Sequence, residues 1–345
     1  MTRTDKLRAL LKDGEGALIT GYANIFYYSG FTSEDAVLII TKTRQIIATD
    51  SRYTVQARQQ AADFELYDIS AGLSGIAAGL DCDTLGFEED YVTVKQLAGF
   101  QKLGKKLIPM QKRISSLRRC KSAEEIEKIK SAEELGDAAF AHLLTQLHTG
   151  MTEIDAALIL ETYMRKNGAS KTSFDTIVAS GVRSAMPHGA ASGKIIEKGD
   201  FVTFDFGCVL DGYCSDMTRT VVMGVCSQRQ REIYDTVLKA QLAGISAVAL
   251  GKSCAEIDKA ARDVITQAGY GENFGHSLGH SVGIEIHEFP VFSPKSIDVT
   301  EIGNVITVEP GIYIDGFGGV RIEDVVAIGE NVQNLTKSCK DLTII

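Results

Sequence analysis

The chain has 345 residues, of which 44% are hydrophobic and 23% charged, the proportions of a folded globular protein. Its formal net charge of -9 argues against nucleic acid or an anionic membrane surface as the main partner. A chain of this length exceeds a typical single core and predicts two domains.

The first residues, MTRTDKLRALLKDGEG, predict a short amphipathic helix. They lack the continuous apolar stretch of a secretory signal peptide, and no later stretch has the length and apolar character of a membrane span. The seven cysteines are odd in number and form no CxxC pair, which favours reduced thiols over a disulfide framework. We therefore expect a cytoplasmic protein with no membrane partner.

Residues 1–120 alternate strand-like apolar runs with helical segments. The predicted strands are GALITGY, AVLIIT, RQIIATD, ELYDI, TLGFE and KLIPM. Helices are expected to begin near Tyr53, Ala71 and Val92. This alternation predicts an α/β domain, and it contains no motif that indicates chemistry of its own.

A basic and polar junction separates this region from the rest of the chain. SAEE, beginning at Ser122, has the form of a capping box that opens a long helix. We place the boundary there, with a second domain over residues 121–345.

The second domain contains a faint internal repeat. GMTEIDAALILETYMRKNGA from Gly150 resembles GKSCAEIDKAARDVITQAGY from Gly251, and both share a glycine, a hydroxyl N-cap candidate and the letters EID. Each is followed by a glycine-rich stretch with histidine, the first carrying His188. Unless the shared letters are a coincidence, the repeat predicts a pseudo-twofold domain with its site between the halves.

Two aspartates lie on a predicted hairpin, FVTFDFGCVLDGYCSDMTRTVVMG, whose Asp-Gly turn is a strong hairpin signal. A turn centred there places Asp205 opposite Thr218 and Asp216 opposite Gly207. The two carboxylates then share one face, where they could hold a pair of cations about 3.5–4 Å apart.

A second strand pair, NVITVEPGIYIDGFGGVRIEDVVAIG, carries Glu309 and Glu323, with Arg321 sharing the parity of Glu323. Four carboxylates in such apolar runs are costly to bury unless cations compensate them, and one guanidinium cannot balance four negative charges. Carboxylate oxygens with a neutral imidazole suit Mn²⁺, Co²⁺, Fe²⁺ or Zn²⁺, and the mostly oxygen donor set favours manganese.

The stretch GHSLGHSVGIEIHE holds His276, His280 and His287. Its three glycines disfavour a helix, and SVGIEIHE alternates like a strand. In an uninterrupted strand His280 and His287 would face opposite ways. Either the glycines bend the chain or these histidines do different work.

Together these residues resemble the family of creatinase, aminopeptidase P, prolidase and methionine aminopeptidase, whose catalytic domain has the pita-bread fold. The family pattern has two aspartates with ten residues between them, a GHxxG histidine, a glutamate before Pro-Gly and a glutamate in a terminal strand. It is matched in order by Asp205, Asp216, His280, Glu309 and Glu323.

The resemblance implies a creatinase-type α/β domain followed by a pita-bread domain, in which pseudo-twofold helix-strand repeats surround a curved antiparallel sheet. TDSRY, from Thr49, also resembles the amino-terminal domain of the longer prolyl members.

The resemblance also implies a ligand set for two divalent metal ions. Asp205 would bind one ion, His280 and Glu309 the other, and Asp216 and Glu323 both.

Other residues receive substrate and catalytic roles from the same resemblance. His188 and His287 would flank the scissile bond, and Glu309 would act as general base. His276 would help wall the pocket, unless it only satisfies backbone groups near a turn. Arg321 would orient Glu323 or a substrate carboxylate, or serve in an ion pair alone.

The expected activity is that of a metal-dependent exopeptidase acting on proline-containing peptides at the Xaa-Pro bond. The sequence leaves aminopeptidase P and prolidase specificity open. Family resemblance suggests a homodimer. The alternative is a non-catalytic peptide- or protein-binding member of the same scaffold, against which the complete ligand set argues.

Overall fold

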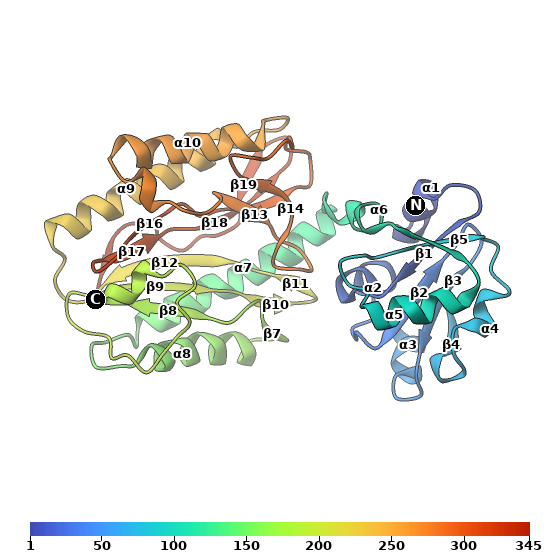
Figure 1. Cartoon of the computed structure of the whole chain (residues 1–345). Helices are drawn as coiled ribbons and strands as arrows, with labels where there is room; N and C mark the ends of the chain where they lie inside the picture. The colour runs from blue at the N-terminus through green and yellow to red at the C-terminus, as the bar shows by residue number, and fades with distance from the viewer. The chain divides into compact units, whose positions relative to one another are not determined.

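The computed structural model describes residues 1–345, and the chain divides into two compact units, Met1–Arg118 and Arg119–Ile345 (Figure 1). No helix is both long enough and apolar enough to cross a membrane.

The amino-terminal unit is built on a six-stranded mixed sheet of order β4-β3-β2-β1-β5-β6. Its strands are β1 (Glu15–Ile19), β2 (Ala36–Ile40), β3 (Gln45–Thr49), β4 (Glu65–Asp68), β5 (Thr84–Phe87) and β6 (Lys106–Pro109). Its α-helices are α1 (Arg3–Leu10), α2 (Tyr22–Ser29), α3 (Thr54–Gln60), α4 (Ser74–Ala77), α5 (Val94–Phe100) and α6 (Gln111–Ser115). All six predicted strands are therefore confirmed.

Helix α2 is an element that the sequence did not predict. Its residues, YANIFYYS, are apolar on most sides and six of the eight are buried, so they show no amphipathic period. The helix ends where Gly30 adopts a left-handed conformation with φ of 74°.

The carboxy-terminal unit opens with α7 (Ala123–Leu144), for which the capping box at Ser122 was predicted. The structure confirms both of its bonds: the Glu125 amide donates to Ser122 Oγ over 3.3 Å, and the Ser122 amide donates to Glu125 Oε2 over 2.9 Å.

Four sheets and three further α-helices complete this unit. The helices are α8 (Glu153–Lys166), α9 (Gln228–Ala247) and α10 (Cys254–Gln267). A four-stranded sheet contains β8 (Ile177–Ser180), β9 (Phe201–Phe206), β12 (Met217–Val222) and β20 (Thr343–Ile344). A five-stranded sheet contains β13 (Gly279–Ser281), β14 (Glu288–Phe292), β15 (Val305–Val308), β18 (Asp324–Ile328) and β19 (Val332–Asn334). The smaller sheets pair β7 (Lys171–Thr172) and β11 (Tyr213–Cys214) with β10 (Cys208–Leu210), and β16 (Gly311–Ile314) with β17 (Gly318–Arg321).

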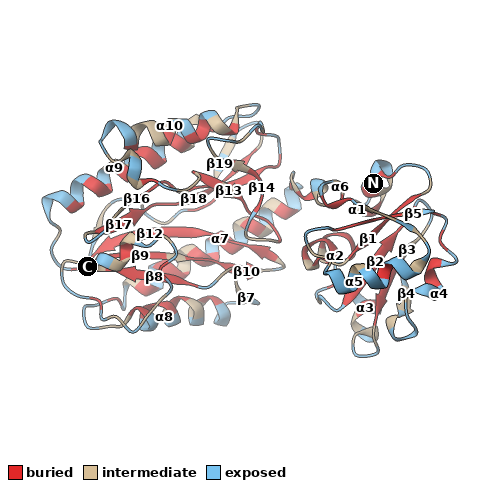
Figure 2. Ribbon diagram, viewed as in Figure 1, coloured by how far each residue is buried: buried red, intermediate tan, exposed pale blue.

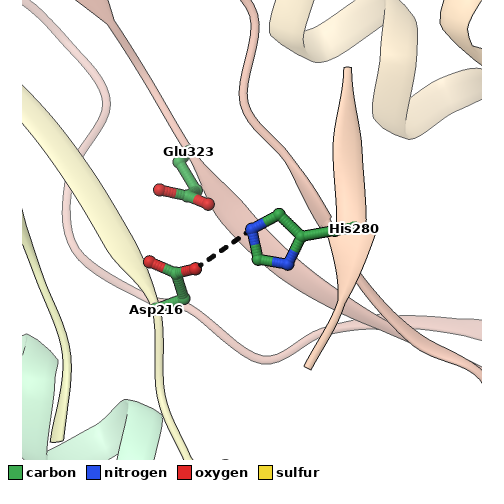
Figure 3. Close-up of side chains that lie close together, drawn as sticks. All are labelled: Asp216, His280 and Glu323. Carbon is green, nitrogen blue, oxygen red and sulfur yellow. Dashed lines mark ion pairs between the residues drawn. The ribbon is translucent and has the colours of Figure 1, made fainter. Parts of the chain in front are cut away.

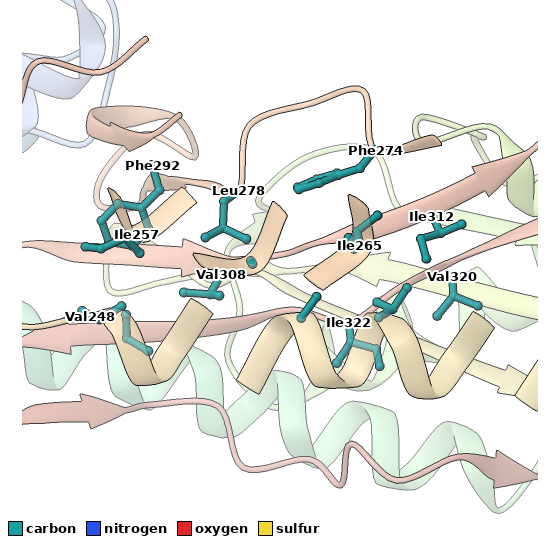
Figure 4. Close-up of a cluster of buried hydrophobic side chains, with 14 of the residues drawn as sticks. Val248, Ile257, Ile265, Phe274, Leu278, Phe292, Val308, Ile312, Val320 and Ile322 are labelled. Carbon is teal, nitrogen blue, oxygen red and sulfur yellow. The ribbon is translucent and has the colours of Figure 1, made fainter. Parts of the chain in front are cut away.

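The strands of this unit lie between two helical layers, with α7 and α8 on one side and α9 and α10 on the other (Figure 1). The helix faces that are turned toward the strands are buried (Figure 2). In one apolar cluster, side chains of α7 and α8 pack against Val202, Phe204 and Phe206 of β9. The other joins α9 and α10 to β15 and β17 and includes Val308 and Val320 (Figure 4). Because the apolar side chains of these strands point toward the helices, the polar side chains that alternate with them lie on the opposite face of each strand.

The internal repeat corresponds to α8 and α10, which are both 14 residues long and begin after the hydroxyl N-caps Thr152 and Ser253. Both N-caps form an isolated antiparallel bridge, to Ile195 and to Val299.

The shared letters EID do not occupy equivalent helical positions, however. Glu153 is the first residue of its helix, whereas Glu256 is the third of its own. The two halves are thus related by their fold, although the EID letters lie two positions later in α10 than in α8.

Candidate metal and peptide site

The site lies in a cavity of about 650 Å³ in the carboxy-terminal unit. Its walls include all nine residues that the sequence singled out: His188, Asp205, Asp216, His276, His280, His287, Glu309, Arg321 and Glu323. These residues come from both halves of the repeat, so the cavity lies where the halves meet.

The aspartate hairpin has the predicted register. Asp205 on β9 pairs with Thr218 on β12, and the pairing continues without interruption to Phe201 and Val222. The turn residues Asp211 and Gly212 have φ values of 49° and 82°, as a two-residue hairpin turn requires. Asp216 directly precedes β12 and faces the same cavity as Asp205.

The two glutamates lie where strands end. Glu309 directly follows β15, and Glu323 lies between β17 and β18. The Glu323 amide donates to the carbonyl of Thr218 over 3.1 Å, while the Thr218 hydroxyl donates to Glu323 Oε2 over 2.6 Å. These bonds fix one glutamate against the aspartate hairpin.

The strand predicted for SVGIEIHE is wrong over residues 282–287, which form a bend between β13 and β14. The pairing of these strands shifts between His280 and Ser281. As a result the rings of His280 and His287 meet, with centroids 4.3 Å apart. The bend thus brings together two histidines that a regular strand would separate.

Gly279 permits the close approach of β13 to β15. A Cβ at this position would lie 1.9 Å from the carbonyl oxygen of Thr307. Only glycine fits, and the backbone carrying His280 is therefore held directly against the strand that ends at Glu309.

The side chains converge on one point (Figure 3). Ligand atoms of Asp216, His280 and Glu323 all lie within 4.8 Å of one another. His280 Nε2 lies 3.5 Å from Asp216 Oδ2 and 3.5 Å from Glu309 Oε1. Asp205 lines the same cavity and directs Oδ2 to Arg321.

Three carboxylate oxygens of this group are buried without a hydrogen-bond partner: Asp205 Oδ1, Asp216 Oδ1 and Glu323 Oε1. An unpaired buried carboxylate oxygen is costly, and a cation satisfies it. The donor set is mostly oxygen with one imidazole, which fits a first-row divalent ion such as Mn²⁺.

The electrostatics indicate the same deficit of positive charge. Burial, together with the neighbouring carboxylates, raises the pKa of Asp216 and of Glu323 well above the usual range. Burial also raises the pKa of Glu309 to about 8. For His280, burial lowers the pKa to about 4, which leaves its imidazole neutral and able to act as a ligand.

Arg321 is the cation paired with this group. It is 3% exposed and donates to Asp205 Oδ2 over 2.7 Å, to Thr218 Oγ1 over 3.0 Å and to Tyr313 Oη over 2.7 Å. Among the carboxylates, Arg321 contacts only Asp205 directly. The Thr218 hydroxyl, which accepts from Arg321, donates in turn to Glu323. Arg321 is therefore bonded to one carboxylate directly and to a second through the Thr218 hydroxyl.

Of the remaining histidines, His276 has partners for both ring nitrogens. Nδ1 lies 2.8 Å from the carbonyl of Ser277, and Nε2 lies 2.9 Å from Tyr313 Oη. His188 and His287 line the same cavity and are exposed within it. Among the histidines that line the cavity, these two are the exposed ones.

Sequence reasoning missed Tyr313 and Glu133. Tyr313 joins His276 to Arg321 through its hydroxyl. Glu133, 1% exposed on α7, accepts from the Asp216 amide over 2.8 Å and from the Thr336 hydroxyl over 2.9 Å. In KSAEELG nothing separates Glu133 from the neighbouring surface acids, because its partners are remote in sequence.

Comparison with known proteins gives two family matches. The model described as metallopeptidase family M24 matches residues 127–330, and that of the creatinase/prolidase N-terminal domain matches residues 3–120.

Solved structures of similar chains cover nearly all of the protein. A structure titled Xaa-Pro dipeptidase from Bacillus anthracis has a TM-score of 0.96 and 43% identity, over 99% of both chains. An X-Pro aminopeptidase from Thermotoga maritima has a TM-score of 0.92 and 37% identity, over 99% of this chain and 100% of its own. In sequence, an Xaa-Pro dipeptidase of Pyrococcus horikoshii is 38% identical over 95% of this chain and 94% of its own.

Proposed function

The chain belongs to metallopeptidase family M24, and from that membership we propose that it hydrolyses the Xaa-Pro bond of short proline-containing peptides. The observation that carries the proposal is the convergence of five potential ligands with His188 and His287 around one cavity. Dipeptides are the first candidates, because relatives similar over nearly their whole length are named Xaa-Pro dipeptidases. The peptidase titled X-Pro aminopeptidase supports longer Xaa-Pro peptides as the second candidate.

We propose that residues 121–345 form the catalytic domain and hold two divalent ions, of which Mn²⁺ is the first candidate and Co²⁺, Zn²⁺ and Fe²⁺ are alternatives. Asp205 would serve one ion, His280 and Glu309 the other, and Asp216 and Glu323 both. The unpartnered oxygens of Asp205, Asp216 and Glu323 support this assignment. Such ions supply Lewis acidity and a nucleophilic water at neutral pH.

The protein's own groups would carry the proton and the orientation. Glu309 would take the proton from the attacking water and return it to the leaving nitrogen. His188 and His287, exposed in the cavity, would donate to the developing oxyanion and hold the substrate backbone. His276 is engaged with Tyr313 and would form the wall, and Arg321 would hold the carboxylates in place.

A binding protein without activity is the alternative on the same scaffold. Three carboxylate oxygens in one cavity are buried without a partner, and this lowers the stability of the fold unless a cation binds there. A protein that bound no metal would carry that cost without any benefit. We also propose a homodimer, which light scattering of the purified protein tests, and a cytoplasmic location, which fractionation of the cells that produce the protein tests.

The test is hydrolysis of an Xaa-Pro dipeptide and of an Xaa-Pro-Yaa tripeptide with Mn²⁺, with products identified by mass spectrometry. Release of the residue before proline, lost after chelation and regained with Mn²⁺, is the expected result. Preference for the dipeptide would assign prolidase specificity, and preference for the tripeptide would assign aminopeptidase specificity. No cleavage of either by protein shown to contain metal would refute the peptidase proposal.

A further inference from the structure

A buried acid in the first half of the repeat is bonded to the segment that carries His188. Glu153, the first residue of α8, has 0% exposure. Its Oε1 accepts from the amide and hydroxyl of Ser180, each over 2.8 Å. Its Oε2 accepts from the amide of Ser192 over 3.1 Å, from the Ser192 hydroxyl over 2.6 Å, and from Arg183.

These partners bracket the loop of residues 181–192. Ser180 ends β8 where the loop begins, Ser192 lies at its far end, and Arg183 lies on the short helix η4 (Gly181–Ala185) inside it. A single carboxylate therefore ties both ends and the middle of the loop to α8. His188 itself is exposed in the cavity, so its position depends on how firmly the loop is held.

The second half also has a buried acid beneath its histidine segment. Asp258 on α10 is 1% exposed and accepts from the amide of Leu278 over 3.0 Å. It also pairs with Arg262 through two bonds of 2.7 and 2.9 Å. Arg262 in turn donates to the carbonyls of Phe274 and His276 over 2.9 and 2.8 Å.

Leu278 links this acid to the candidate ligands. Its amide is held by Asp258, its carbonyl accepts from the Glu309 amide over 2.8 Å, and His280 follows two residues later. The acids are not equivalent in the repeat, because Glu153 is the first residue of α8 and Asp258 the fifth of α10. Each half thus supports its histidine segment with an acid at a different helical position.

We propose that Glu153 and Asp258 are positioning residues, each acting through the histidine segment of its own half. The proposal rests on the proposed function for its kinetic effects. Because the segments carry different groups, the two acids have separable effects: Glu153 places His188 against the substrate, whereas Asp258 places His280 and Glu309 around the metal.

Glu153→Gln keeps the size of the side chain but replaces one carboxylate oxygen by an amide NH₂ group. That group is a donor and faces other donors, so the hydrogen bonds of the replaced oxygen are lost. The loop loosens, and we expect kcat to fall about 10- to 100-fold while Mn²⁺ affinity stays within twofold. Asp258→Asn should instead weaken Mn²⁺ binding about 10- to 100-fold. The matched controls are Glu161→Gln and Glu256→Gln, which change solvent-accessible acids on the same two helices.

Hydrogen exchange of metal-free protein tests the proposal without reference to activity. Glu153→Gln should speed exchange in residues 181–192 only, and Asp258→Asn in residues 274–280 only, with both controls like wild type. Unchanged exchange in these segments overturns the positioning roles, whatever the enzyme's activity. If Glu153→Gln loosens the whole unit, Ser192→Ala, which removes one bond of the same carboxylate, must still loosen residues 181–192 or the proposal fails.

Kinetics then separate positioning from general support. In a His188→Ala background, Glu153→Gln should cause no further loss of kcat, because the group through which it acts is gone. An additive loss overturns the role of Glu153. Protein that shows the exchange pattern and the Mn²⁺ affinities but cleaves no peptide refutes the proposed function and leaves the positioning of the two segments standing.

Discussion

Replacing Arg321 by methionine removes the guanidinium that pairs with Asp205 while keeping most of the apolar volume. Arg321 is 3% exposed and makes three hydrogen bonds, to Asp205, Thr218 and Tyr313. Removing one partner of a buried ion pair costs about 3–5 kcal/mol, because the other charge stays buried and unpaired. We expect the metal-free variant to lose that much free energy of unfolding.

The cost should depend on metal. Divalent ions beside Asp205 would supply the missing positive charge, so the loss with saturating Mn²⁺ should fall to less than half of the loss in chelator. The chain has no tryptophan, and urea unfolding is therefore followed by far-ultraviolet circular dichroism. The matched control is Arg44→Met, which breaks a solvent-exposed pair with Glu65 in the amino-terminal unit and should cost about 0–1 kcal/mol.

Two results would refute this reasoning. If Arg321→Met costs no more than Arg44→Met, the guanidinium does not compensate the acidic group. If the cost is the same in chelator and in Mn²⁺, the ions do not bind beside Asp205.

Three further predictions concern the same cavity. Tyr313→Phe removes the hydroxyl shared by His276 and Arg321 and should lower the free energy of unfolding by about 1–3 kcal/mol, and an unchanged urea midpoint would contradict this. His188→Ala should lower kcat by about 10²–10³-fold at unchanged Mn²⁺ affinity, measured by steady-state kinetics and calorimetry; a loss of metal instead would make His188 a ligand. The pKa of Glu309 is raised from 4.5 to about 8, so the unfolded chain ionises first and the metal-free protein should lose stability as pH rises between those values. At about 1.4 kcal/mol per pKa unit the loss is at most about 5 kcal/mol, and Glu309→Gln should reduce this dependence in urea midpoints taken from pH 4 to 9.

Local patterns in the sequence predicted the parts of the fold that depend on neighbouring residues. The six strands of the amino-terminal unit and the capping box at Ser122 are such cases. The hairpin of Asp205 also belongs here, because an Asp-Gly turn fixes strand register by itself.

A bend at residues 282–287 was one of two alternatives that the sequence left open, and local alternation could not decide between them because it favoured a strand. The close approach at Gly279 depends on a partner remote in sequence, since a Cβ there would lie 1.9 Å from the carbonyl oxygen of Thr307. Tyr313 and Glu133 were missed for the same reason, since their roles come from contacts made only in the folded chain.

The most direct test of the proposed site is calorimetric titration of Mn²⁺ into chelator-treated protein, comparing wild type with His280→Ala and with His148→Ala, a histidine outside the cavity. We predict about two ions bound per chain in wild type and in His148→Ala, as two-metal hydrolytic sites require, and weaker binding of at least one ion in His280→Ala, with Xaa-Pro cleavage falling in parallel. Wild-type binding and cleavage in His280→Ala would contradict the assignment of this cavity as the metal centre.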